Sequence, residues 1–165
     1  MCGIAGIVWK QTTTKRRELL EGVIPLIRSR GPDEAGIYID NNVGLVHTRL
    51  SIIDYAGGKQ PFCLGPGQPI LIFNGEIFNY QNLRTVLERE GVLFRTNSDT
   101  EVLYALLCKY GEKAVRDLNG QFAFCFFNPQ TGTLILARDQ FGEKPLYYSE
   151  DQGFGADGDT PEGNR

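Results

Sequence analysis

Short apolar runs separated by turn-forming residues occupy most of the chain and predict β-strands. We interpret as strands the runs at residues 3–9, 36–39, 43–53, 70–73, 122–127 and 134–137, with 145–148 as a candidate for one more. The run 122–127 is continuously apolar, which is typical of a strand buried on both faces. Residues 128–132 are typical of a hairpin turn. Many short strands with a few helices between them predict a layered α+β fold.

Two segments carry apolar residues at helical spacing. The first follows Thr12 to Thr14, which offer N-caps, and Pro25 should weaken or kink it. Its apolar face consists of Leu19, Leu20, Val23, Ile24 and Ile27. The second segment covers 83–90 and should end at Gly91, because glycine adopts the left-handed conformation that closes many helices.

A third helix is predicted by a capping box. Ser98 and Glu101 stand directly before the apolar segment 102–109, in the pattern where each side chain bonds to the other residue's backbone N–H. Residues 30–33 and 55–69 are rich in glycine and proline, so we expect a turn and a loop there.

Composition restricts the class of protein. The chain has 165 residues, 41% of them hydrophobic and 22% charged, which suits one globular domain. A net charge of -3 argues against nucleic acid or an anionic membrane as the main partner. The sequence shows no signal-peptide pattern and no apolar run of about 18 residues, so we expect a cytoplasmic protein without membrane contact.

Cysteine and histidine are too sparse for a metal site of the zinc type. The chain has four cysteines, none in a CxxC pair, and His47 as its one histidine. A disulfide framework is not expected either. The acidic, glycine-rich segment 150–165 reads as a disordered tail. It fits GxGxxG, but too few residues follow for the helix and acid that a dinucleotide site needs, so we reject that interpretation.

Cys2 is a candidate nucleophile if Met1 is removed. Thiol and free α-amine then belong to one residue, and an α-amine with a reference pKa of about 7.7–8.0 can accept a proton near neutral pH. Without that processing, Cys2 is an incidental residue. His47 is the competing base, although a histidine in an apolar strand is more often hydrogen-bonded to a neighbour, which we favour.

The triplet Asn74-Gly75-Glu76 interrupts an apolar run. One interpretation is a turn at a strand end, because Asn-Gly is a common hairpin signal. The other is a pair of donors for an oxyanion, formed by the Asn74 amide and the unobstructed Gly75 N–H. The residues alone leave both interpretations open.

Arg49 stands within an apolar run and needs a partner. An ion pair with Asp54 or Glu76 would satisfy it, and so would a substrate carboxylate bound by both ends of the guanidinium. Asp99 suits the first turn of a helix, but Glu76 and Asp99 together could also bind an ammonium group. An amino-acid substrate would need all three side chains.

Seven segments, in order, resemble the class II glutamine amidotransferases, most closely the glutaminase domain of glutamine-dependent asparagine synthetases. They are MCGIAGIV at the start, RSRGPDEAG at 28–36, HTRLSIID at 47–54, FNGEIFNY at 73–80, SDTE at 98–101, LNGQFAF at 118–124 and RDQFGEKPLYY at 138–148. The resemblance implies a four-layer αββα sandwich of the N-terminal-nucleophile hydrolase type. It also implies that residues 2–149 form the glutaminase domain.

The resemblance further implies a role for each candidate residue. Cys2 would be the nucleophile and its amine the base, with Asn74 and Gly75 as the oxyanion hole. The α-carboxylate of L-glutamine would bind Arg49 and the backbone of Leu50, Ser51, Ile52 and Ile53, and its α-ammonium would bind Glu76 and Asp99. No metal or other cofactor is implied.

The expected reaction is hydrolysis of the glutamine side-chain amide to glutamate and ammonia. The family's synthetase domain, with its ATP-binding loop, has no counterpart in this sequence, so we expect no ATP-dependent synthesis from this chain alone. A synthetase encoded separately or truncated away would be the protein partner. The alternative is an inactive fragment or a non-catalytic binding module that retains the fold.

Overall fold

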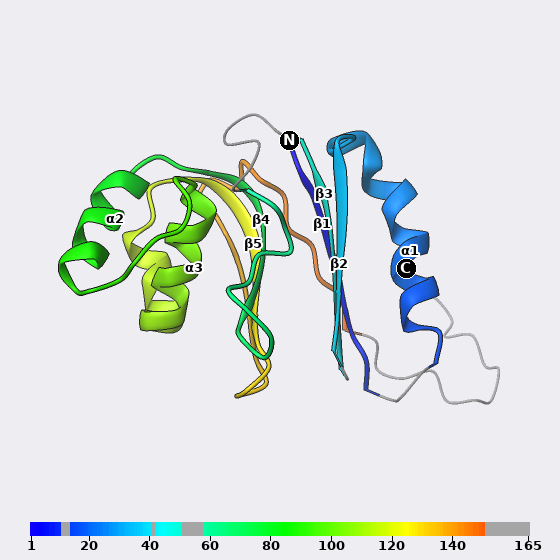
Figure 1. The fold of residues 1–165 in the computed structure, drawn as a ribbon. Helices are drawn as coiled ribbons and strands as arrows, with labels where there is room; N and C mark the ends of the chain where they lie inside the picture. The colour runs from blue at the N-terminus through cyan, green and yellow to red at the C-terminus, as the bar shows by residue number, and fades with distance from the viewer. Residues whose placement is uncertain (11–13, 41, 51–57, 151–165) are drawn as a thin grey trace.

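The fold consists of four layers, with two sheets packed face to face between outer helices (Figure 1). The structure is a computed structural model of the chain, and it describes residues 1–10, 14–40, 42–50 and 58–150. One helix covers the outer face of the first sheet, and two helices cover the outer face of the second. The expected αββα sandwich is therefore confirmed.

The first sheet contains the N-terminus. Its strands β1 (Gly3–Val8), β2 (Glu34–Ile39) and β3 (Val43–Arg49) are antiparallel in the order β1-β3-β2. Every residue of the central strand β3 is buried. Gly3 lies opposite Thr48, so Cys2 is placed at the end of the sheet where β3 finishes with Arg49.

The second sheet contains the polar triplet. Its strands β4 (Ile70–Ile77), β5 (Gly120–Asn128) and β6 (Thr133–Arg138) are antiparallel in the order β4-β5-β6. Strand β4 runs straight through the triplet, so the turn interpretation of Asn74-Gly75 is wrong. The strand can continue because Gly75 pairs in register with Phe122 of β5.

The helices agree with the predicted segments to within a few residues. Helix α1 (Arg16–Ile27) includes Pro25 and leads into the short 3-10 helix η1 (Arg28–Arg30). Helix α2 (Tyr80–Arg89) precedes Gly91, whose φ of 87° is left-handed as expected. Helix α3 (Asp99–Tyr110) is followed by the 3-10 helix η2 (Gly111–Asp117).

Strand alternation decides which side chains face the other sheet. One apolar cluster fills the space between the sheets and consists of Val43, Leu45, Ile70, Ile72, Cys125 and Phe127. A larger cluster lies between the second sheet and the two helices that cover it. Because Ile70 and Ile72 face the first sheet, the period of two places Asn74 and Glu76 on that same inner face.

Two expectations are corrected. Residues 145–150 form no strand, and Tyr147 and Tyr148 are largely exposed; Pro145 has no N–H to donate to a ladder. The N-cap predicted at Thr12 to Thr14 is not formed by Thr14, because α1 begins after Lys15 without a side-chain cap. Thr12, Thr13 and the tail 151–165 lie outside the described residues. In the part described, no helix has the length and apolar character to cross a membrane.

Candidate active site

A cavity of about 170 Å³ lies where the two sheets and the start of α3 meet. The predicted site residues that line it are Cys2, Arg49, Leu50, Asn74, Gly75, Glu76 and Asp99. The first three come from the first sheet or its end, the next three from β4, and Asp99 from α3. The remaining predicted residues, Ser51, Ile52 and Ile53, lie outside the described part of the chain.

Cys2 lies directly before β1 and is held there by contacts with its neighbours. Its half-buried sulfur lies 3.9 Å from the carbonyl oxygen of Leu50, and its own carbonyl accepts a 3.2 Å hydrogen bond from Arg30 Nε. Gly31 follows this arginine, and a Cβ there would lie 2.3 Å from the carbonyl oxygen of Thr48. Only glycine allows this approach, which fixes η1 beside Cys2.

The open edge of β4 presents backbone N–H groups toward the cavity. Leu71 N–H bonds to Phe62 O, Phe73 N–H to the Gln60 side chain at 2.6 Å, and Ile77 N–H to Asp99 Oδ2 at 3.0 Å. Alternation places the Gly75 N–H on this same edge. No described residue accepts a hydrogen bond from it, so this donor is open to a ligand.

Asn74 supplies a second open donor. Its side chain is only 4% exposed, faces the first sheet and lines the cavity. Its amide makes no hydrogen bond with any residue of the described ranges. Because the amide reaches the cavity, a ligand oxygen between it and the Gly75 N–H could accept a hydrogen bond from both.

Arg49 has a partner that the sequence did not suggest. It forms an ion pair with Glu34 on β2, with 3.2 Å between Nη1 and Oε2, rather than with Glu76. Glu34 lies directly opposite Arg49 in the strand register, which the sequence alone did not indicate. The other expected partner, Asp54, lies outside the described residues. A Cβ on Gly58 would lie 2.7 Å from Arg49 Nη2, so this glycine gives the guanidinium its space.

Asp99 is the buried carboxylate of the cavity. Burial raises its pKa, and the charge of Glu76 adds to that effect, although the N–H of Ile77 and that of Thr100 oppose it. A cation bound between the two carboxylates would offset the cost of burying the Asp99 charge and the repulsion between Asp99 and Glu76. Glu76 itself is exposed.

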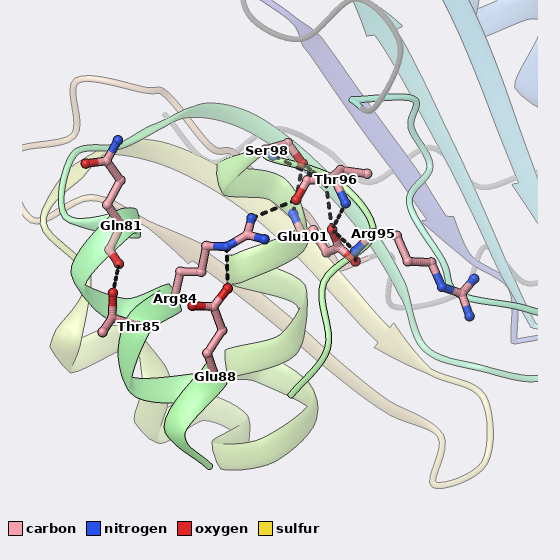
Figure 2. Close-up of polar contacts among 8 residues, drawn as sticks. All are labelled: Gln81, Arg84, Thr85, Glu88, Arg95, Thr96, Ser98 and Glu101. Atoms are coloured by element: carbon pink, nitrogen blue, oxygen red, sulfur yellow. Dashed lines mark hydrogen bonds and ion pairs between the residues drawn. The ribbon is translucent and has the colours of Figure 1, made fainter. Parts of the chain in front are cut away.

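The loop before Asp99 is fixed by Glu101, a side chain only 2% exposed (Figure 2). Ser98 accepts from the Glu101 N–H as the capping box predicts, but the Glu101 carboxylate accepts from Thr96 N–H at 2.7 Å and Arg95 N–H at 3.0 Å. Arg84 adds a 2.7 Å bond to the Thr96 carbonyl oxygen. These contacts position the start of α3 in the cavity wall.

His47 is buried and does not line the cavity, as expected of a structural residue. Burial lowers its pKa to about 4; the hydrogen bond to the Phe73 carbonyl opposes this, and the charge of Arg49 contributes to it. A histidine so placed is a poor base for Cys2. Among the described residues, no group of three His, Cys, Asp or Glu side chains is arranged to hold a metal ion.

Three residues of the site received no role from the sequence. Arg30 contacts Cys2, Gln60 bonds to β4, and Lys144 lines the cavity. Arg30 and Lys144 stand within two of the seven segments quoted above, which is the signal that could have drawn attention to them. Their contacts are between distant parts of the chain, so spacing could not reveal them.

A family model described as a glutamine amidotransferase domain matches residues 1–157, which is nearly the whole chain. The chain belongs to this family. The matched range includes all seven segments quoted above.

Curated relatives agree with this family and are much longer. Asparagine synthetase [glutamine-hydrolyzing] 1 of Bacillus subtilis is 45% identical over 152 residues, which cover 90% of this chain and 24% of the relative. Asparagine synthetase B [glutamine-hydrolyzing] of Escherichia coli is 38% identical over 154 residues, 92% of this chain and 27% of the relative. This amidotransferase domain thus spans about a quarter of the length of the curated relatives it matches.

A solved structure supports the fold. Glutamine phosphoribosylpyrophosphate amidotransferase from B. subtilis superposes with a TM-score of 0.63 at 23% identity, over 84% of this chain and 37% of that one. At this identity the likeness concerns the arrangement of the layers.

Proposed function

We propose that this domain hydrolyses the side-chain amide of L-glutamine to glutamate and ammonia, with Cys2 as nucleophile. The observation that carries the proposal is the pair of open donors on β4 beside the Cys2 thiol. The Asn74 amide and the Gly75 N–H line one cavity with Cys2 and have no acceptor among the described residues. This is the arrangement that stabilises the oxyanion of acyl transfer.

The reaction begins when Met1 is removed and the Cys2 α-amine takes the thiol proton. The sulfur attacks the amide carbon of glutamine, and the carbonyl oxygen becomes an oxyanion between the Asn74 amide and the Gly75 N–H. The proton passes to the leaving nitrogen, ammonia departs, and a glutamyl thioester remains. Water then attacks the thioester, releases glutamate and returns the proton to the thiol.

The two ends of an amino acid fit the charges of the cavity wall. The buried Arg49 guanidinium and the neighbouring backbone from Leu50 bind the α-carboxylate. Glu76 and Asp99 bind the α-ammonium, which gives the two carboxylates of the cavity a cationic partner. Cys2 lines the same cavity, so an amino acid held at both ends would place its side chain beside the thiol.

The ammonia acceptor belongs to a larger assembly. Because relatives named asparagine synthetases extend well beyond this domain, the partner that fits is a synthetase domain that receives the ammonia. A cytoplasmic location, as expected from the sequence, suits this role.

The test combines the mass of the purified protein with an assay of glutamate and ammonia. Protein lacking Met1 should release both products in equal amounts from glutamine, and Cys2→Ala should release none while keeping its circular dichroism spectrum. Cys63→Ala is the matched control, because that thiol is exposed in a loop outside the cavity. Absence of hydrolysis by correctly processed wild-type protein would favour the non-catalytic binding module.

A further inference from the structure

Lys144 is a buried cation in the wall of the cavity. Its side chain is only 7% exposed, and its ammonium nitrogen donates to Gln121 Oε1 at 2.7 Å. An ammonium has three N–H donors, and Gln121 is a neutral acceptor. Within the ranges that the structure describes, Lys144 forms no ion pair with a carboxylate. A cation buried in this way is costly unless negative charge appears near it.

Lys144 is held in this position from two sides. Asp139, itself buried, accepts hydrogen bonds from the backbone N–H of Lys144 at 3.0 Å and from that of Phe122 at 3.2 Å. These two bonds join the segment that follows β6 to β5. Gln121, the residue before Phe122, then holds the far end of the lysine side chain. Burial would raise the pKa of Asp139, but bonds from four backbone N–H groups lower it to about 2, so the anchor stays charged at any pH used for activity.

The orientation of Gln121 shows which sheet the Lys144 ammonium faces. In β5 the neighbouring Phe122 belongs to the cluster under the helices, so alternation turns Gln121 toward the first sheet. It lies opposite Glu76 in the register, on the same inner face as Asn74. Gln121 and Lys144 therefore belong to the wall that faces Cys2, and both line the cavity.

We propose that Lys144 is a charge-stabilising residue of this site. Its ammonium, held by Gln121, stabilises negative charge on the Cys2 sulfur before attack and on the oxyanion that the attack creates. The inference rests on the proposed function in taking Cys2 as the nucleophile. It adds a group for which the mechanism above had no use.

Two arginines near Cys2 also carry positive charge. Arg49 is offset by Glu34, whereas Arg30, whose Nε is bonded to the Cys2 carbonyl, does not line the cavity and adds its charge to that of Lys144. Glu76 and Asp99 place negative charge in the cavity, which disfavours a thiolate until a substrate ammonium neutralises them. Lys144 counteracts these carboxylates on the same side of the cavity.

Alkylation of Cys2 by iodoacetamide as a function of pH tests the proposal without any need for glutamine turnover. The rate at the N-terminal peptide, followed by mass spectrometry in protein lacking Met1, reports the thiolate fraction of this one cysteine. Lys144→Met removes the charge and keeps the chain length. Loss of a unit charge across a small cavity changes a thiolate fraction about tenfold. The pH profile of Cys2 alkylation in Lys144→Met should therefore lie about one pH unit higher than in wild type. Lys144→Arg should restore the wild-type profile.

Lys113→Met is the matched control, since the same charge is lost from an exposed residue outside this cavity. Gln121→Glu places a carboxylate beside the Lys144 ammonium and should also move the alkylation profile to higher pH. This variant tests the proposal if Lys144→Met fails to fold. Profiles of Lys144→Met or Gln121→Glu that coincide with wild type would overturn the proposal. Active wild-type protein with such profiles would refute the role of Lys144 alone, whereas inactive wild-type protein would refute the proposed function.

Discussion

His47 and Phe73 are joined by a hydrogen bond that crosses between the two sheets. The Nε2 of His47, on β3, lies 3.2 Å from the carbonyl oxygen of Phe73, on β4, and because a carbonyl only accepts, Nε2 carries the proton. Phe73 directly precedes the two proposed oxyanion donors. This contact therefore fixes the strand that carries them against the sheet that carries Cys2.

The burial of His47 predicts a loss of stability in mild acid. With a pKa lowered to about 4 in the folded protein and about 6.5 unfolded, the unfolded chain binds more protons between these values. Stability should fall as pH drops below about 6.5, by about 2 kcal/mol on reaching pH 5. Urea unfolding of wild type and His47→Gln at about pH 6.5 and at pH 5 measures the change in the free energy of unfolding. The variant keeps an N–H for Phe73 and should show a smaller fall; equal falls would contradict the assignment.

Gly75 should tolerate no side chain. Its φ is +156°, and a Cβ there would lie 2.1 Å from the carbonyl oxygen of Gln121. Gly75→Ala should lower the free energy of unfolding by about 3 kcal/mol or more and abolish glutamine hydrolysis, because β4 must separate from β5. Gly65→Ala, where a Cβ meets nothing within 4 Å, is the control and should unfold like wild type. Two variants of equal stability would show that β4 and β5 adapt easily.

Arg49 and Asn74 should differ in the kinetic constant that they affect. Arg49→Lys keeps the charge opposite Glu34 but loses the fork, so KM for glutamine should rise about tenfold or more with kcat little changed. Asn74→Ala removes a donor used only in the transition state, so kcat should fall about 10²–10³-fold with little change in KM. Steady-state kinetics of both variants provide the measurement, and exchanged phenotypes would reverse the assigned roles.

Glu101 should matter for substrate binding although it does not line the cavity. Glu101→Gln places an amide where three donors of Arg95 and Thr96 converge, so the loop before Asp99 should loosen. We expect a loss of stability of about 2 kcal/mol and a raised KM for glutamine. Glu88→Gln removes a carboxylate from an exposed pair with Arg84 and serves as control (Figure 2). A Glu101→Gln protein with normal KM would separate the loop from the site.

The order of the strands and helices could be predicted because local patterns carry it. Continuous apolar runs marked β4 and β5, and the Ser98 cap marked α3, so these elements lie close to where the sequence placed them. The candidate residues could be named because the seven segments resemble a known family. What the resemblance could not provide is how each side chain is satisfied.

The missing information is long-range. Arg49 pairs with Glu34 because two strands are in register, and Lys144 reaches Gln121 because Asp139 ties a turn to β5. The Glu101 carboxylate also bonds to the loop before α3, and not to the Ser98 N–H that the capping box predicted as its partner. None of these contacts follows from spacing along the chain, since each depends on where a third element lies.

Asp99 should give glutamine hydrolysis an acidic limb at an unusually high pH. Burial and the charge of Glu76 raise its pKa, and the protonated form cannot pair with the substrate ammonium. As pH falls, protonation of the Cys2 α-amine, which must accept the thiol proton, lowers kcat/KM first. Asp99 should add a second limb, at a pH above that at which an ordinary aspartate, with a pKa of about 3.9, is protonated. Asp99→Asn should have low kcat/KM at all pH values and lack this limb. Glu76→Gln should keep the limb but move it to lower pH, because the repulsive charge is gone. A second limb that survives in Asp99→Asn at the wild-type position would assign it to another group.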